Sequence, residues 1–170
     1  RQLAWFGVGL FALTIVASID YRRLVQMAPL LYIGGLAALI AVFVLGRTVS
    51  GARRWLLIGP LSVQPSEMFK LCFVLMAVWL VTSRWAQPIG KTALIMAAPV
   101  AMVPAVLIVK QPDLGTALLL FPVLIALFVA AGLRLRTLGG LVLAGVAALP
   151  LAWFAMKEYQ RERILVFLDP

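Results

Sequence analysis

Two short polar stretches stand where long apolar runs begin, and they have residue types suited to handling a charged substrate. "VQPSEMFK" (63–70) opens one apolar run and "KQPDLGT" (110–116) opens another. Each stretch has Gln-Pro, then a small polar or acidic residue, then a helical segment. Proline suits the first position of a helix, and Asp or Ser beside it accepts hydrogen bonds from the free N–H groups of the first turn. The simplest prediction is that Asp113 caps a helix.

A second prediction for the same stretches is an anion site. The positive ends of two helices would gather on one face with the side chains of Gln64, Gln111, Arg53, Arg54 and Lys110. Helix N-termini together with Arg and Lys suit phosphate or pyrophosphate. Glu67 and Lys70 lie at positions i and i+3, so they share one flank of a helix. They form either a structural ion pair or a pair of ionisable groups facing a substrate cavity, and the two roles are compatible.

Composition excludes several other kinds of site. The chain has no His and one Cys, which rules out a disulfide framework and a Cys/His metal site. Cys72 lies inside an apolar run and is predicted to be a small core residue. The sequence has no phosphate loop, nucleophile elbow or metal-ligand motif. No cofactor is required by these patterns, and a divalent cation stays open.

Helices in a lipid bilayer must position these residues. The 170 residues are 64% hydrophobic and 12% charged, with a mean hydropathy of +1.08, whereas a soluble domain is about 25% charged. A helix needs roughly 20 apolar residues to cross a bilayer. The sequence therefore predicts an all-α, polytopic integral membrane bundle with about six transmembrane helices. The apolar runs cover residues 2–19, 25–46, 66–83, 92–109, 116–132 and 137–156.

Short polar connectors alternate between the two faces of this bundle, and no linker divides the chain, so residues 1–170 are predicted to form a single domain. Lys and Arg number seven on the face of the two motifs and six on the other, which does not decide the orientation. Within the connector 47–65, the stretch "GARRWLLIGPLSVQP" (51–65) alternates polar and apolar segments and contains Trp55, so we expect a helix or loop lying along the membrane surface there. The chain begins at Arg1 rather than Met, and we expect it to be part of a longer protein.

Three stretches together resemble one known family. They are "GARRWLLIGPLSVQPSEMFKL" (51–71), "KQPDLGTALL" (110–119) and "YQRERILVFLDP" (159–170). In order and spacing they resemble the SEDS family (shape, elongation, division and sporulation), also called the RodA/FtsW family. The third stretch favours the RodA-like branch over the FtsW-like branch. The resemblance covers essentially the whole chain.

The resemblance implies a ten-helix protein of the bacterial inner membrane with both ends in the cytoplasm. This chain would run from the second helix to just beyond the seventh, and the face with the three motifs would be extracytoplasmic. The implied activity is a peptidoglycan glycosyltransferase that polymerises lipid II, the undecaprenyl-pyrophosphate-linked disaccharide pentapeptide, during cell elongation or division. The implied partner is a class B penicillin-binding protein, which supplies the transpeptidase.

The same resemblance assigns substrate-binding residues. Those that match the family's central cavity are Gln64, Glu67, Lys70, Asp113 and Thr116. The basic position of the first motif is Arg53 or Arg54, of which Arg54, beside Trp55, matches more closely. Further candidates on the same face are Lys110, Gln160 and Arg163.

The chain departs from the family pattern at two points. Ser62 and Val63 stand where many members have a basic or aromatic residue, which puts substrate contacts there in doubt. The aspartate usually proposed as catalytic lies beyond Pro170, and Asp169 does not correspond to it. The resemblance thus places no catalytic residue in this chain, and we expect the chain alone to be inactive.

The mechanism that the resemblance suggests needs a carboxylate to deprotonate the sugar 4-hydroxyl of an acceptor. It also needs positive charge on the departing pyrophosphate, from Arg, Lys, helix N-termini or a divalent cation. The candidates for this charge are Arg54, Lys70, Lys110 and Arg163. Asp113 and Glu67 would orient them or help hold a cation. Two other classes remain open: a flippase or permease for a lipid-linked precursor, and a scaffold whose buried charges only fix packing. A transporter would be expected to show inverted repeats with broken helices, and two motifs on one face give little support for that.

Overall fold

The computed structural model describes residues 2–49, 52–58, 61–83, 91–155, 158, 161 and 165. Within these ranges the chain forms seven helices and three short strands. The helices are α1 (Gln2–Ser18), α2 (Tyr21–Gln26), α3 (Ala28–Leu45), α4 (Pro65–Ser83), α5 (Lys91–Lys110), α6 (Leu114–Ala130) and α7 (Leu135–Ala155). The six long helices coincide with the six predicted apolar runs to within a few residues. Only α2 was not anticipated; Asp20 caps it by accepting a hydrogen bond from the backbone N–H of Arg22 at 2.9 Å.

The helices have the composition of a membrane protein. Among the described residues, three segments are long and apolar enough to cross a bilayer: Ala28–Leu45, Pro65–Thr82 and Ala93–Lys110. Shorter apolar helices cover Phe6–Ser18, Leu114–Ala130 and Leu135–Ala148. The outer surface of the bundle carries many large apolar side chains, such as those of Leu30, Val44 and Leu71. The predicted helical membrane architecture is therefore confirmed.

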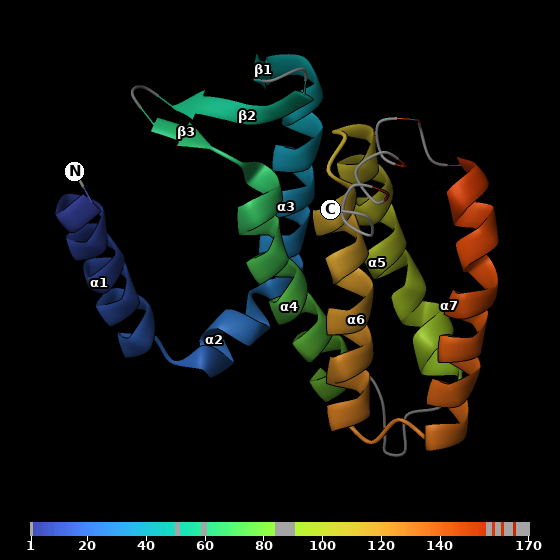
Figure 1. Ribbon diagram of the computed structural model, residues 1–170. Helices are drawn as coiled ribbons and strands as arrows, with labels where there is room; N and C mark the ends of the chain where they lie inside the picture. The colour runs from blue at the N-terminus through green and yellow to red at the C-terminus, as the bar shows by residue number, and fades with distance from the viewer. Residues whose placement is uncertain are drawn as a thin grey trace.

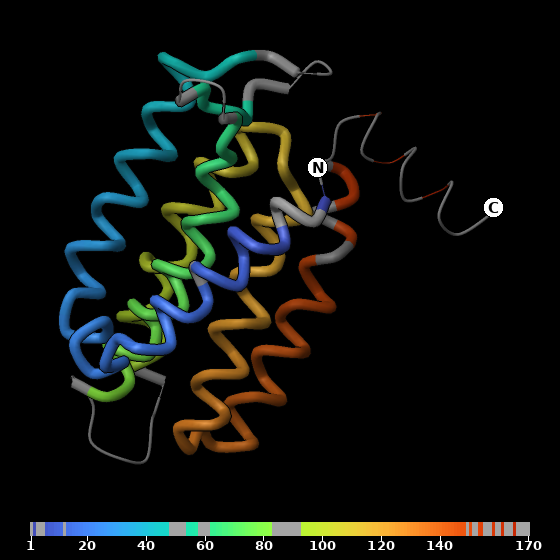
Figure 2. Tube along the Cα trace, turned by 90° about the vertical axis from the view of Figure 1, so that its left-hand side faces the viewer, coloured from blue at the N-terminus to red at the C-terminus, as the bar shows by residue number. Residues whose placement is uncertain are grey.

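Helices α3, α4, α5 and α6 lie side by side and form the centre of the bundle, with α7 at one side (Figure 1). Helix α1 stands apart from this centre and is joined to it through α2 (Figure 1). In Figure 2, which is turned by 90°, α1 crosses in front of the bundle. The core is built from aromatic and aliphatic side chains facing a row of small residues on α5. Its buried members include Leu39, Phe69, Phe73, Ala97, Ala101, Ala105, Ile108, Leu120 and Phe128. Small residues on one helix let the neighbouring backbones approach closely.

Close packing between α3 and α4 depends on a glycine. A Cβ atom added at Gly35 would lie 2.7 Å from Cδ2 of Phe69, whereas one added at Gly34 would meet nothing within 4 Å. The Phe69 ring also packs against Tyr32, with ring centroids 5.4 Å apart. The hydroxyl of Tyr32 donates to the carbonyl of Val100 at 2.8 Å, which links α3 to α5.

The connector between α3 and α4 forms a small antiparallel sheet, in the order β1 (Arg47–Val49), β2 (Ala52–Ile58), β3 (Leu61–Val63). The prediction of a surface helix or loop for 51–65 is wrong, because strands β2 and β3 lie there. Gly51 and the pair Gly59-Pro60 divide this connector into stretches of at most seven residues. Gly and Pro disfavour a helix that continues through these positions, whereas strand pairing satisfies the backbone groups of the stretches between them.

This sheet lies at the end of the bundle where α3 ends and α4 begins (Figure 1). Strand β3 leads through Gln64 directly into α4, and the turn at 111–113 leads from α5 into α6. Helices α4 and α6 contact each other along the bundle. The two Gln-Pro stretches therefore lie at the same end of the molecule, as their spacing predicts.

Candidate functional site

Asp113 is the N-cap of α6, as the sequence predicts. Its Oδ1 accepts a hydrogen bond from the backbone N–H of Thr116 at 3.3 Å. The Thr116 side chain is buried. An N-cap carboxylate satisfies one of the free N–H groups of the first turn and interacts favourably with the positive end of the helix. Only one of the two carboxylate oxygens is used for this purpose.

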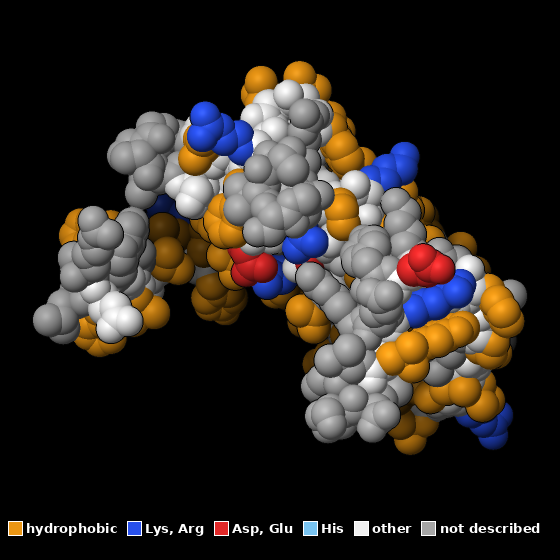
Figure 3. Space-filling view, turned by 45° about the horizontal axis from the view of Figure 1, so that its top comes forward, with side chains coloured by type: hydrophobic (Ala, Val, Ile, Leu, Met, Phe, Trp, Pro, Cys, Tyr) orange, Lys and Arg blue, Asp and Glu red, His pale blue; other side chains and the backbone are white. Residues whose placement is uncertain are grey.

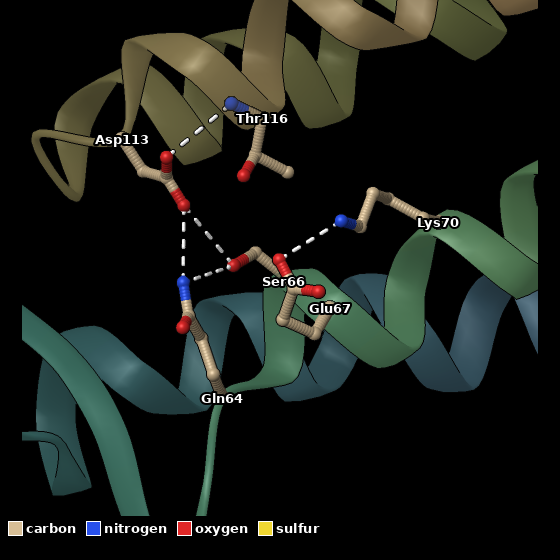
Figure 4. Close-up of polar contacts among 6 residues, drawn as sticks. All are labelled: Gln64, Ser66, Glu67, Lys70, Asp113 and Thr116. Carbon is tan, nitrogen blue, oxygen red and sulfur yellow. Dashed lines mark hydrogen bonds and ion pairs between the residues drawn. The ribbon is translucent and has the colours of Figure 1, made fainter.

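The other oxygen of Asp113 reaches the beginning of α4 (Figure 4). Its Oδ2 accepts hydrogen bonds from Nε2 of Gln64 at 3.1 Å and from Oγ of Ser66 at 3.3 Å. Gln64 Nε2 also lies 3.0 Å from Ser66 Oγ. Asp113 therefore connects the N-terminal ends of two helices whose residues are 49 positions apart in the sequence. We call Gln64, Ser66, Asp113 and Thr116 the Asp113 cluster.

Glu67 and Lys70 form the predicted ion pair on α4. Oε1 of Glu67 lies 2.9 Å from Nζ of Lys70, and the two side chains are 53% and 34% exposed. Figure 4 shows the pair close to Ser66, next to the Asp113 cluster. Lys70 also borders a small, otherwise apolar cavity of about 90 Å³ between α4 and α6, lined among others by Phe73 and Leu120. That the pair contacts a substrate remains a prediction.

Arg54 is the arginine of β2 that reaches this end of the bundle. Its Nε donates to the carbonyl of Gln111 at 3.0 Å, and its Nη2 donates to the carbonyl of Pro112. The Gln111 side chain is only 2% exposed and donates through Nε2 to the carbonyl of Leu39 at 2.9 Å. For Arg53 the structure describes the backbone, which pairs with Thr48, but not the side chain.

Of Lys110, Gln160 and Arg163, the structure describes only Lys110. Lys110 is exposed in the last turn of α5, where a positive charge interacts favourably with the negative end of the helix. Gln160 and Arg163 lie outside the described residues. Within the described part of the chain, no group of three or more Asp, Glu, Cys or His residues is placed to hold a metal ion.

Ser66 and Gln111 also belong to this site: Gln111 was expected on this face with the anion-binding groups, and Ser66 was expected only as a possible helix cap. Both stand next to a proline in the two Gln-Pro motifs, and both are almost completely buried. Buried polar side chains in proteins are nearly always hydrogen-bonded, so their burial implies partners. A signal was present in the repeated Gln-Pro pattern, but the partner of each side chain was not predictable from it.

The arrangement is suited to binding an anion next to carboxylates. Two helix N-termini meet at one end of the bundle, with Arg54, Lys70 and Lys110 on the same side of the molecule. Figure 3, which brings this end forward, shows basic and acidic side chains lying beside each other. Helix N-termini and cationic side chains stabilise phosphate groups, and a carboxylate can accept a proton. Fold and site together define a polytopic helical membrane protein with a polar, mixed-charge centre at one membrane face.

Comparison with known proteins narrows this class to one family. The family model FTSW_RODA_SPOVE, described as "Cell cycle protein", matches residues 1–170. The chain belongs to this family of cell cycle proteins, and the resemblance inferred from its motifs is confirmed.

The relatives include named cell-wall enzymes. The chain is 36% identical over 173 residues to "Peptidoglycan glycosyltransferase MrdB" of Escherichia coli (strain K12), which covers 100% of the chain and 46% of the relative. It is 38% identical over 159 residues to "Probable peptidoglycan glycosyltransferase FtsW" of Shewanella sediminis (strain HAW-EB3), which covers 92% of the chain and 38% of the relative. The chain thus spans less than half the length of these relatives.

Solved structures agree with the fold. A chain from a study titled "Structural coordination of polymerization and crosslinking by a peptidoglycan synthase complex" matches with a TM-score of 0.79 and 35% identity, over 100% of this chain and 50% of that one. The rod shape determining protein RodA of Thermus thermophilus matches with a TM-score of 0.71 and 35% identity, over 89% of this chain and 49% of that one. The helical arrangement is therefore a RodA-like fold.

Proposed function

We propose that this chain is part of a peptidoglycan glycosyltransferase that polymerises lipid II into glycan strands during cell elongation or division. The observation that supports it most strongly is the Asp113 cluster, in which one carboxylate joins the N-terminal ends of α4 and α6. Family membership and relatives named as peptidoglycan glycosyltransferases point the same way.

The proposed topology follows the family expectation. The six long helices would be the second to seventh of ten membrane helices, within a single transmembrane domain. The sheet and the Asp113 cluster would face the outside of the cytoplasmic membrane. At that face a polymerase would meet lipid II whose diphosphate lies at the headgroup level, next to the ends of α4 and α6.

In the proposed mechanism the residues of this chain bind and orient the substrate. Lys70 and Lys110 would stabilise the diphosphate of lipid II, because developing negative charge on the leaving group needs positive charge nearby. Gln64, Glu67 and Thr116 would line the binding site, together with Arg53, Gln160 and Arg163. Asp113 would orient these groups or help hold a divalent cation. The aspartate proposed as catalytic in the family would come from beyond Pro170, so this chain alone would be inactive.

A partner that crosslinks the new strands is part of the proposal. One of the matched structures comes from a study of a peptidoglycan synthase complex. We propose a class B penicillin-binding protein as the partner, because polymerised glycan must be joined to existing wall by a transpeptidase. The surrounding bilayer would be the bacterial inner membrane.

The test is reconstitution of the full-length protein with its penicillin-binding partner and labelled lipid II in vesicles. Glycan chains separated on a gel would support the polymerase. Movement of labelled lipid II between leaflets without polymer would indicate a flippase instead. Neither product from folded protein would indicate a scaffold, and either of these two results would overturn the proposal.

A further inference from the structure

The turn between α5 and α6 carries Asp113, and it is held from two sides. Within the turn, the backbone N–H groups of Gln111 and Asp113 both donate to the carbonyl of Ile108, at 3.0 and 3.2 Å. These local bonds close the end of α5 but do not orient the turn towards α4. Orientation requires contacts with other elements, and the structure provides two of them.

One contact is made by the Gln111 side chain towards α3. Its amide is buried and donates to the carbonyl of Leu39, 72 positions away in the sequence. Because a buried amide without a partner is unfavourable, this bond favours one position of the turn over others. The contact anchors the turn to the interior of the bundle.

The other contact is made by Arg54 from the sheet. Its guanidinium directs Nε and Nη2 at two successive carbonyls, those of Gln111 and Pro112. A planar guanidinium can hold two acceptors at once in a fixed geometry, which a lysine ammonium does not reproduce. The contact fastens β2 to the same turn from the outer side.

We infer that Arg54 and Gln111 are positioning residues that set the place of the Asp113 carboxylate. Together they hold the residues immediately before Asp113 between α3 and the sheet. Oδ2 of Asp113 can then meet Gln64 and Ser66 on α4 while Oδ1 caps α6. This role differs from a direct contact between Arg54 and a diphosphate, because two nitrogens of the guanidinium are directed at carbonyl groups of the protein itself.

The inference rests on the proposed function only in that Asp113 serves the reaction. The test compares the wild type with three variants: Arg54→Lys, Arg54→Gln and Gln111→Met. Each full-length protein is combined with its penicillin-binding partner, and polymerisation of labelled lipid II is measured. Arg47→Lys is the matched control, since Arg47 is an exposed arginine of the same sheet. Arg54→Lys keeps the positive charge but loses the hydrogen bonds to two carbonyls. It therefore distinguishes binding of an anion by the charge of Arg54 from positioning of the turn by its two hydrogen bonds.

The expected result is a fall in kcat of roughly tenfold to a hundredfold for all three variants, with KM changed about twofold or less, because a small displacement of a reacting group has effects of this size. Arg54→Lys and Arg54→Gln should be equally impaired. Arg47→Lys should behave like the wild type. Near-normal activity of Arg54→Lys, or a loss expressed mainly in KM, would overturn the inference and favour a direct anion contact.

A second measurement does not depend on activity. Amide hydrogen exchange of the purified full-length protein should be faster in peptides covering 110–116 for Arg54→Lys and unchanged for Arg47→Lys. Unchanged exchange in Arg54→Lys would contradict the clamp. If the wild type makes no glycan, the proposed function fails while the exchange result still decides the role of Arg54. Should Gln111→Met not fold, the two Arg54 variants are sufficient.

Discussion

Two sets of polar side chains at the beginning of α4 are held in different ways. Gln64 and Ser66 reach across to Asp113 on another helix, and Ser66 is only 1% exposed. Glu67 and Lys70 pair within α4, and they are 53% and 34% exposed. The first set ties two helices together, whereas the second can release its partner without moving a helix. We therefore expect the Asp113 cluster to set the relative position of α4 and α6, and the pair of Glu67 and Lys70 to contact the substrate.

The largest effect should follow removal of the carboxylate that joins the helices. Asp113→Ala in the full-length protein is expected to lower polymerisation at least about a hundredfold, because misplacing the groups that a residue orients has effects of this size. The amount of folded protein in the membrane should be maintained. Gel analysis of glycan from labelled lipid II, with size-exclusion chromatography of the purified protein, measures both.

Asp113→Asn is the matched control for this change, since it keeps the shape and can still cap α6. It should fold like the wild type and remain strongly impaired. Normal glycan synthesis by Asp113→Ala would reduce the role of Asp113 to a helix cap and remove the contrast between the two sets.

Exchanging the ion pair tests the other side of the comparison. Glu67→Lys combined with Lys70→Glu restores an ion pair at i and i+3 but moves the positive charge by one turn. Polymerisation should remain about tenfold or more below wild type, the loss expected when a hydrogen bond to a charged group is removed. Stability should change little, because exposed helix pairs are worth roughly 0.3–0.5 kcal/mol.

The alternative is that Glu67 and Lys70 form a purely structural ion pair. If the exchanged pair polymerises normally while Glu67→Gln and Lys70→Gln do not, the pair is structural. Thermal unfolding of the four proteins in the same detergent shows whether stability explains any loss of activity.

A smaller effect is expected from Ser66→Ala. This change removes one donor to Asp113 Oδ2 and leaves Gln64 in place. A net hydrogen bond contributes about 1 kcal/mol, so we expect a loss of polymerisation of roughly fivefold and a slightly lower melting temperature. Ser66→Thr, which keeps the hydroxyl, is the control for the loss of the donor. A loss as large as that of Asp113→Ala would show that the carboxylate depends on Ser66 far more than on Gln64.

The sequence predicted those parts of the site that depend on neighbours along the chain. The cap formed by Asp113 spans three residues, as does the pair of Glu67 and Lys70, so local helix geometry was sufficient for both. The long helices followed from apolar length in the same way. The contacts between Gln64 and Asp113 and between Arg54 and Gln111 span 49 and 57 residues. They depend on how helices pack and on a sheet whose pairing the composition of 47–65 did not reveal.

The smallest effect on activity should come from the packing beneath both polar sets. Gly35→Ala places a methyl group 2.7 Å from the Phe69 ring, and extra carbon in a packed core costs about 1–3 kcal/mol. Gly34→Ala is the matched control, since nothing lies within 4 Å of its added Cβ. Phe69 is buried on the inner face of α4, whereas Lys70 next to it is partly exposed. Gly35→Ala should therefore lower the melting temperature relative to Gly34→Ala. The folded Gly35→Ala protein should still polymerise lipid II within about twofold of wild type, because the change affects the packing of α4 rather than either polar set. A loss of polymerisation at temperatures where the variant remains folded would instead mean that the angle between α3 and α4 sets the Asp113 cluster directly.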